Sequence, residues 1–240
     1  NNKHILMYTG VVDKKNENGE HYVRQVQCIA IGDGENYFKL DSNPVITDEL
    51  LPEGSSFEDF RDPKIWKEDG DFYSVVASRS KDGSGQILMF KSENLKTWEL
   101  VTILDKSENK LGRMWECPDF FNIDGKNVLV ISPQEVRATK DGFHNGNNTA
   151  FLIGEYDKEN KKFNREKTKV IDFGLDFYAP QTFEDKDGRR IMIGWMQSWE
   201  NRIIPNEFKW YGMMTIPREI RIKDNNVIQT PIKEIENYYG

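Results

Sequence analysis

The chain has 240 residues, of which 37% are hydrophobic and 12% aromatic, with nine prolines, eighteen glycines and a formal net charge of −7. The length suits one domain or a large part of one, and many aromatic and turn residues are typical of an all-β protein. The negative charge argues against a nucleic-acid partner. A neutral or anionic small-molecule partner remains open.

Cysteine and histidine usage limits the chemistry further. Two cysteines, Cys28 and Cys117, do not make a disulfide framework, so we predict free thiols and a reducing, cytoplasmic compartment. No signal peptide or membrane-spanning segment is recognised, and no membrane partner is expected. His4, His21 and His144 are isolated, and no glycine-rich phosphate loop precedes a helix. We therefore predict no catalytic metal and no cofactor.

The first part of the chain predicts strands over 4–12, 22–31 and 37–40, separated by a charged hairpin loop over 13–20 and an Asp-Gly turn at 33–34. They are interpreted as the outer strands of a sheet unit. A loop over 47–58 follows. No long helix is predicted anywhere, and the best helical candidate is 233–239.

Three later segments repeat one pattern, at 60–66, 115–121 and 177–183. Each has a proline at the start of a strand, where a missing N–H is tolerated, and an Asp-Gly hairpin signal soon after it. Further strands are predicted in each unit. The third strands are expected at 86–91, 149–155 and 212–217, and the fourth at 98–104, 167–172 and 227–231.

Four strands per unit, repeating at roughly 55 to 62 residues, predict the blades of a β-propeller, with boundaries near residues 59, 114 and 176. The first strand of a propeller blade lines the central axis. The residues just before each repeated proline are therefore expected to converge on one funnel, which places Asp62, Glu116 and Tyr178 near one another.

The stretch 114–121 places two carboxylates, Glu116 and Asp119, among Trp, Pro and Phe residues. Burial disfavours the charged form of a carboxyl group, and a protonated carboxyl can donate its proton to a leaving group. The structural alternative is a buried acid that is hydrogen-bonded to backbone N–H groups. Cys117 is interpreted as a packing residue, because no histidine lies near it in the sequence.

Phe60-Arg61-Asp62-Pro63 and Trp115-Glu116-Cys117-Pro118-Asp119 closely resemble two signature motifs of glycoside hydrolase family 32 (GH32), the β-fructosidases. Further stretches resemble the same family in the same order, and they are 7–10, 25–28, 43–45, 176–181, 193–196 and 216–219. The resemblance implies a five-bladed β-propeller, usually followed by a β-sandwich, and a retaining mechanism with two carboxylates.

Carried over by motif, the resemblance makes Glu116 the general acid/base and Asp62 the transition-state stabiliser that holds hydroxyls of the fructosyl ring. Arg61 would help to set the charge state and orientation of this cluster. Two aromatic residues, Trp195 and Tyr178, are candidates for stacking on a sugar, with a core role as the alternative for Trp195. Asp176 is a further candidate at a strand entrance, although such acids often cap a turn.

One feature of the family is absent from the sequence. Its nucleophile is an Asp in an Asn-Asp-Pro-Asn-Gly motif, which does not occur in these 240 residues. We therefore expect the nucleophile to lie outside this chain. The chain is interpreted as an internal piece of the catalytic domain, incomplete at about four of five blades, without the first blade and the C-terminal sandwich.

The function expected from the resemblance is hydrolysis of terminal β-fructofuranosides, with sucrose, sucrose 6-phosphate and fructans as open alternatives. A phosphate site would need Arg or Lys at the pocket rim, and Arg137 and Arg202 are the candidates. Two other functions stay open. One is a catalytically inactive carbohydrate-binding fragment, and the other is an inverting five-bladed glycosidase acting on arabinosides or xylosides.

An incomplete propeller exposes strand edges and apolar blade faces. We predict that the isolated chain is marginally stable or self-associates through these edges. Size-exclusion chromatography tests this expectation, and elution as a stable, compact monomer would count against it.

Overall fold

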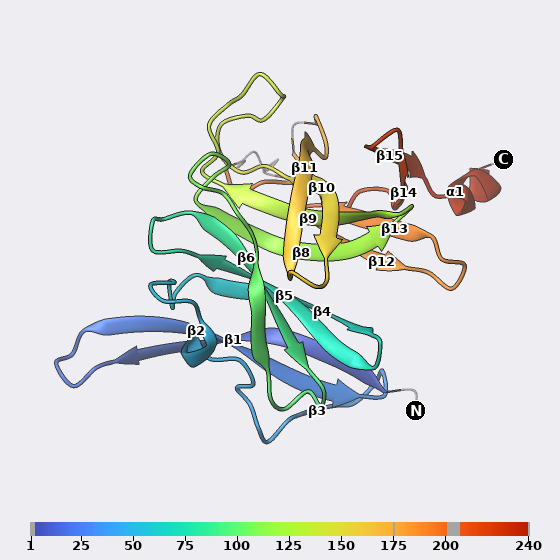
Figure 1. Ribbon diagram of the computed structural model, residues 1–240. Coiled ribbons are helices and arrows are strands. Elements are labelled where there is room, and N and C mark those ends of the chain that lie inside the picture. Colours follow the sequence, from blue (N-terminus) through green and yellow to red (C-terminus); the bar gives the residue numbers. More distant parts are fainter. Residues whose placement is uncertain (1–2, 175, 201–206, 240) are drawn as a thin grey trace. The chain divides into compact units, whose positions relative to one another are not determined.

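The computed structural model describes residues 3–174, 176–200 and 207–239, and its strands form four antiparallel sheets (Figure 1). The first sheet has three strands, and a short 3-10 helix, η1 (Asp48–Leu50), follows it. Its strands are β1 (His4–Lys15), β2 (His21–Gly32) and β3 (Tyr37–Lys39).

The other three sheets each contain four strands that neighbour one another in chain order. The second sheet consists of β4 (Phe60–Glu68), β5 (Asp71–Arg79), β6 (Gly85–Ser92) and β7 (Glu99–Lys106). The third consists of β8 (Met114–Ile123), β9 (Lys126–Gln134), β10 (Ala150–Asp157) and β11 (Lys162–Val170). The fourth consists of β12 (Tyr178–Glu184), β13 (Arg190–Trp195), β14 (Arg218–Lys223) and β15 (Asn226–Pro231).

The all-β prediction is confirmed, and the sheets are consistent with the blades of an incomplete propeller. The best helical candidate of the sequence, 233–239, forms the short helix α1 (Lys233–Tyr239). Within the described ranges, no helix is long and apolar enough to cross a membrane.

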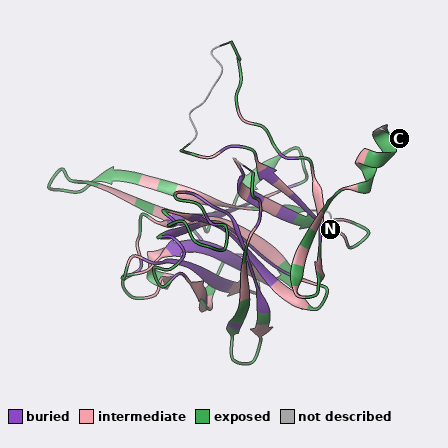
Figure 2. Ribbon diagram, turned by 90° about the horizontal axis from the view of Figure 1, so that it is seen from above, coloured by how far each residue is buried: buried purple, intermediate pink, exposed green. Residues whose placement is uncertain are grey.

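The chain divides into two compact units. Unit 1 comprises residues 1–118 and 158–162, and unit 2 comprises residues 119–157 and 163–240. Buried residues are concentrated within the strands, whereas turns and hairpin tips are mostly exposed (Figure 2).

The core of unit 1 fixes the beginning of β4. Phe60 is fully buried, and its ring lies 6.0 Å from the ring of Phe90 on β6. It packs in a cluster with Ile29, Ile46 and Leu88, all of which are 0% exposed. Burying a large apolar side chain stabilises the fold by about 1.5–3 kcal/mol, so Phe60 holds the residues that follow it in place.

The three repeated prolines share a backbone conformation that the sequence pattern did not predict. The residue before each proline has a positive φ, which is 59° at Asp62, 50° at Cys117 and 50° at Ala179. The strand register shifts at Arg61/Lys64 and at Tyr178/Gln181, as it does at a β-bulge. A non-glycine residue in this region is strained, and such strain often marks a functional site.

This conformation corrects the expected alignment of the motifs. The positions equivalent to Asp62 are Cys117 and Ala179, whereas Glu116 and Tyr178 correspond to Arg61. The three residues named from the sequence therefore do not occupy equivalent positions in their strands.

The strand predicted over 212–217 is wrong. This segment is connected to β13 by an isolated bridge between Trp195 and Met214, and the third strand of the sheet is β14, after Pro217. Gly212 has a φ of 82°, and Pro217 has no N–H for a ladder hydrogen bond, so regular pairing begins only at Arg218.

Asp119, the second carboxylate of the stretch 114–121, has a structural role in unit 2. It is 1% exposed, and its Oδ2 accepts hydrogen bonds from the N–H of Thr182 at 2.8 Å and from the Thr182 hydroxyl at 2.7 Å. Burial lowers the pKa of Arg190, and the Asp119 and Glu184 carboxylates act in the opposite direction. Through its two hydrogen bonds with Thr182, Asp119 joins β8 to β12.

Replacing Asp119 with alanine should lower the free energy of unfolding by about 2–3 kcal/mol, because it leaves the buried groups of Thr182 without this acceptor. Asp119→Asn keeps an acceptor oxygen and should cost less. Urea unfolding followed by tryptophan fluorescence measures both changes. The exposed control Asp141→Ala should stay within about 0.5 kcal/mol, and an equally small loss for Asp119→Ala would contradict this role.

Candidate active site

Two glutamines of β2 hold the start of β4 in unit 1. The N–H of Phe60 donates to Gln25 Oε1 at 2.9 Å, and Gln27 Nε2 donates to the Phe60 carbonyl oxygen at 2.8 Å. Together they satisfy both backbone groups of a fully buried residue, as a strand partner would. Arg61 and Asp62, the next two residues, are thereby given a fixed starting point.

Arg61 binds the carboxylate of Glu116 on β8. Its Nε and Nη2 atoms lie 2.9 Å and 2.7 Å from the same oxygen, Glu116 Oε1. The two side chains are 20% and 13% exposed, and charge-assisted hydrogen bonds of this kind are stronger than neutral ones. Burial opposes the charge of Arg61, but the carboxylates of Glu116 and Asp59 outweigh it and raise the pKa of Arg61.

Asp62 is held between β1 and β8. Its N–H donates to Thr9 Oγ1 at 3.1 Å, and its Oδ2 accepts from the N–H of Cys117 at 3.0 Å. The Thr9 hydroxyl donates in turn to Gln27 Oε1 at 3.0 Å. The structure thus brings Arg61, Asp62 and Glu116 together, as the sequence predicted for Asp62 and Glu116.

The thiol of Cys117 lies beside this cluster, 3.6 Å from Asp62 Oδ2. Burial and the charges of Asp62 and Glu116 raise the pKa of Cys117 well above its usual value, although Arg61 acts in the opposite direction. A thiol is nucleophilic as its thiolate, so this environment supports the interpretation of Cys117 as a packing residue. Both cysteines are free thiols.

The other predicted site residues lie in unit 2. Tyr178 is 1% exposed, and its hydroxyl donates to the carbonyl oxygen of Ser132 at 3.2 Å. Trp195 is half-buried at the end of β13, and its ring lies 5.3 Å from that of Trp199. Asp176 is half-buried two residues before β12. Substrate binding by Tyr178, Trp195 and Asp176 stays a prediction.

Of the two candidates for phosphate binding, Arg137 is exposed in unit 2, and Arg202 lies outside the described residues. In the described ranges, no group of three or more His, Cys, Asp or Glu side chains is arranged to hold a metal ion.

Four residues of the site region were not singled out from the sequence, namely Thr9, Gln25, Gln27 and Asp59. Their contacts with 60–62 are made mostly across 33 to 53 residues of chain. Three of them lie in stretches that resemble the family, 7–10 and 25–28, and that resemblance was the available signal.

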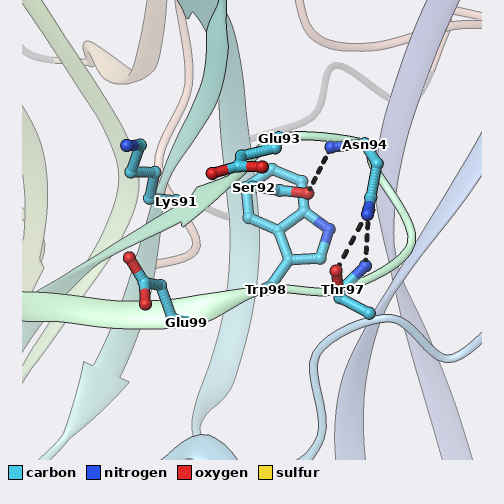
Figure 3. Close-up of a pocket in the computed structure, with 7 residues that line it drawn as sticks. All are labelled: Lys91, Ser92, Glu93, Asn94, Thr97, Trp98 and Glu99. Carbon is cyan, nitrogen blue, oxygen red and sulfur yellow. Dashed lines mark hydrogen bonds between the residues drawn. The ribbon is translucent and has the colours of Figure 1, made fainter.

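A cavity of about 270 Å³ lies elsewhere in unit 1, at the hairpin between β6 and β7 (Figure 3). Ser92 Oγ accepts from the N–H groups of Asn94 and Leu95, and Asn94 Oδ1 accepts from the N–H and hydroxyl of Thr97. These polar groups are used to build the turn, so the cavity is explained by the turn geometry.

Residues 1–231 match the model of the "Glycosyl hydrolases family 32 N-terminal domain". The chain belongs to glycoside hydrolase family 32. It is 37% identical to a sucrose-6-phosphate hydrolase of Zymomonas mobilis, covering 96% of this chain and 46% of that protein. It is also 34% identical to a raffinose invertase of Escherichia coli, covering 97% of this chain and 48% of that protein.

Solved structures of GH32 proteins agree with this fold. A β-fructofuranosidase of Bombyx mori superposes with a TM-score of 0.88 at 34% identity, covering 99% of this chain and 50% of that one. A sucrose-6-phosphate hydrolase of Lactobacillus gasseri gives 0.82 at 29% identity, covering 99% and 48%. The chain thus spans about half the length of the relatives it matches.

Asp62→Asn should make Cys117 react faster with iodoacetamide at pH 8, by several-fold, because loss of a neighbouring negative charge lowers the pKa of the thiol. Peptide mass spectrometry against time measures the rate at each cysteine, with Cys28 as an internal reference. Glu58→Gln, an exposed charge change, should leave the rate unchanged. If Cys117 of the unmodified chain already reacts as fast as an exposed thiol of ordinary pKa, the described environment of this thiol is wrong.

Proposed function

We propose that the whole protein is a retaining β-fructofuranosidase that cleaves terminal β-fructofuranosides such as sucrose or sucrose 6-phosphate. The observation that carries this proposal is the meeting of Arg61, Asp62 and Glu116 at the starts of two strands, in a chain that belongs to GH32. Family membership weighs against the inverting arabinosidase or xylosidase alternative.

In this proposal Glu116 protonates the departing glycosidic oxygen and then activates the water that releases fructose. Arg61 orients the Glu116 carboxylate, because two of its N–H groups converge on one carboxylate oxygen, Oε1. Asp62, fixed by the backbone of Cys117, holds hydroxyls of the fructosyl ring and stabilises the charge that develops on it.

The nucleophilic Asp is proposed to lie outside residues 1–240, since the motif that carries it in the family does not occur in them. A retaining mechanism requires its carboxyl group to lie about 5 Å from that of Glu116 in the whole protein. Neither a metal nor a cofactor is required by these steps.

The substrate class is proposed from the relatives. Those with the matches described above are named for sucrose 6-phosphate and raffinose, and a variant of the Bombyx mori enzyme, 34% identical with a TM-score of 0.86, was solved in complex with sucrose. We propose a small sugar as the partner and, from the two free cysteines, the cytoplasm as the location.

In the whole protein, Glu116→Gln should reduce kcat for fructose release from sucrose by about 100-fold or more, because the leaving glucose departs poorly without protonation. A fructoside with an activated leaving group needs no such proton, so its first step should be largely spared and fructosyl-enzyme should accumulate. Rapid-quench kinetics on both substrates measure the difference.

The matched control is Glu17→Gln, on an exposed loop, which should leave both substrates unaffected. An equal loss of activity on both substrates would indicate that Glu116 is structural. Absence of fructose release from the unmodified whole protein would instead favour a carbohydrate-binding role.

A further inference from the structure

Asp59 lies one residue before β4, in a loop that is fixed from two sides. Ser56 Oγ accepts from the N–H of Asp59 at 3.1 Å and donates to Asp59 Oδ2 at 3.3 Å. On β5, the carbonyl oxygen of Arg79 accepts from the N–H of Ser56 at 2.9 Å. The Arg79 guanidinium reaches Asp59 Oδ2 at 3.4 Å. Ser56 and Arg79 thus fix one oxygen of the Asp59 carboxylate, Oδ2.

The second oxygen of Asp59 binds the arginine of the candidate active site. Asp59 Oδ1 lies 3.1 Å from Arg61 Nη1, on the guanidinium edge that does not contact Glu116. A guanidinium group is planar and holds its N–H donors in a rigid fork, so fixing Nη1 also fixes Nε and Nη2. The geometry of Asp59 is therefore transmitted to Glu116 through one rigid group.

Asp59 also balances the charge of Arg61. The Arg61 side chain is only 20% exposed, and a poorly solvated cation needs anionic partners. With Asp59 present, one carboxylate lies on each side of the guanidinium. Without it, Glu116 would be the one carboxylate left on the guanidinium among the described contacts, and the electrostatic potential at the acid/base would become more positive.

From this arrangement we infer that Asp59 is a positioning residue for the acid/base, acting on Glu116 through Arg61. This inference rests on the proposed function, because it assigns a task within the proposed reaction. Asp59 is distinct from the acid/base and the stabiliser, and it is not expected to touch the substrate.

A cationic group, two acidic groups and a neutral amide surround the contact of Asp59 with Arg61 and of Arg61 with Glu116, in the part of the chain that the structure describes. Those described as facing Asp59, Arg61 or Glu116 are Arg79 from β5, Asp62 from β4, Cys117 from β8 and the neutral Gln25 from β2. Gln25 Oε1 lies 3.5 Å from Arg61 Nη1 and carries no charge, so it cannot replace the balancing role of Asp59.

The test is Asp59→Asn in the whole protein, with pH profiles of kcat/KM for sucrose. Loss of the balancing charge should move the alkaline limb, which reports the general acid, to lower pH by about 0.5 to 1 unit. The value of kcat for sucrose at neutral pH should fall about tenfold with little change in KM. Activity on a fructoside with an activated leaving group should be nearly unchanged.

The matched control is Asp48→Asn in the same unit. Asp48 is 25% exposed against 24% for Asp59, and it also pairs with an arginine, Arg24, at 2.7 Å. Asp48→Asn should leave the pH profile of kcat/KM for sucrose unchanged. Should Asp59→Asn fail to fold, Ser56→Ala, which keeps the carboxylate but removes its hydroxyl partner, should still lower kcat for sucrose alone.

An unchanged alkaline limb with unchanged kcat, or equal losses on both substrates, would overturn the inference. Glu116→Gln, measured in parallel, separates this failure from failure of the proposed function. If Glu116→Gln loses acid catalysis while Asp59→Asn does not, only the inference falls. If Glu116→Gln leaves sucrose hydrolysis intact, the proposed function falls with it.

Discussion

The ion pair between Arg61 and Glu116 is the interaction on which the candidate site depends. It joins residues 55 positions apart in the sequence. The two residues lie near the N-terminal ends of β4 and β8. A poorly solvated pair of this kind contributes little net stability, but it is costly to break and it fixes orientation. The pair orients the carboxylate of Glu116. Gln25 and Gln27 hold the backbone of Phe60, the residue before Arg61.

The left-handed residue before proline is the second constraint, and it occurs three times with different side chains. Asp62, Cys117 and Ala179 adopt the same left-handed conformation before proline. The backbone conformation is therefore the same at the three positions, whereas the side chain differs. At Asp62 the residue in this conformation carries a carboxylate, and at Cys117 its backbone N–H binds that carboxylate. The two strands are therefore complementary at this point.

Much of the fold could be predicted from the sequence, because prolines, Asp-Gly turns and alternating residues are local signals. The four-stranded units and their repeat followed from these signals, and the two motif residues Asp62 and Glu116 do lie together. The strand expected at 212–217 was wrong, because Gly212 and Pro217 prevent regular pairing there. The different roles of Glu116 and Asp119 also depend on distant partners, Arg61 and Thr182, which no local pattern reveals.

The most direct measurement is a crystal structure of the whole protein carrying Glu116→Gln, with sucrose bound. The account predicts that the side chain at position 116 lies about 3 Å from the glycosidic oxygen, with the Asp62 carboxylate on hydroxyls of the fructosyl ring. It also predicts a second carboxylate on the opposite face of that ring, about 5 Å from position 116. Sucrose bound away from Arg61 and Asp62, or with its glycosidic oxygen out of reach of position 116, would contradict the account.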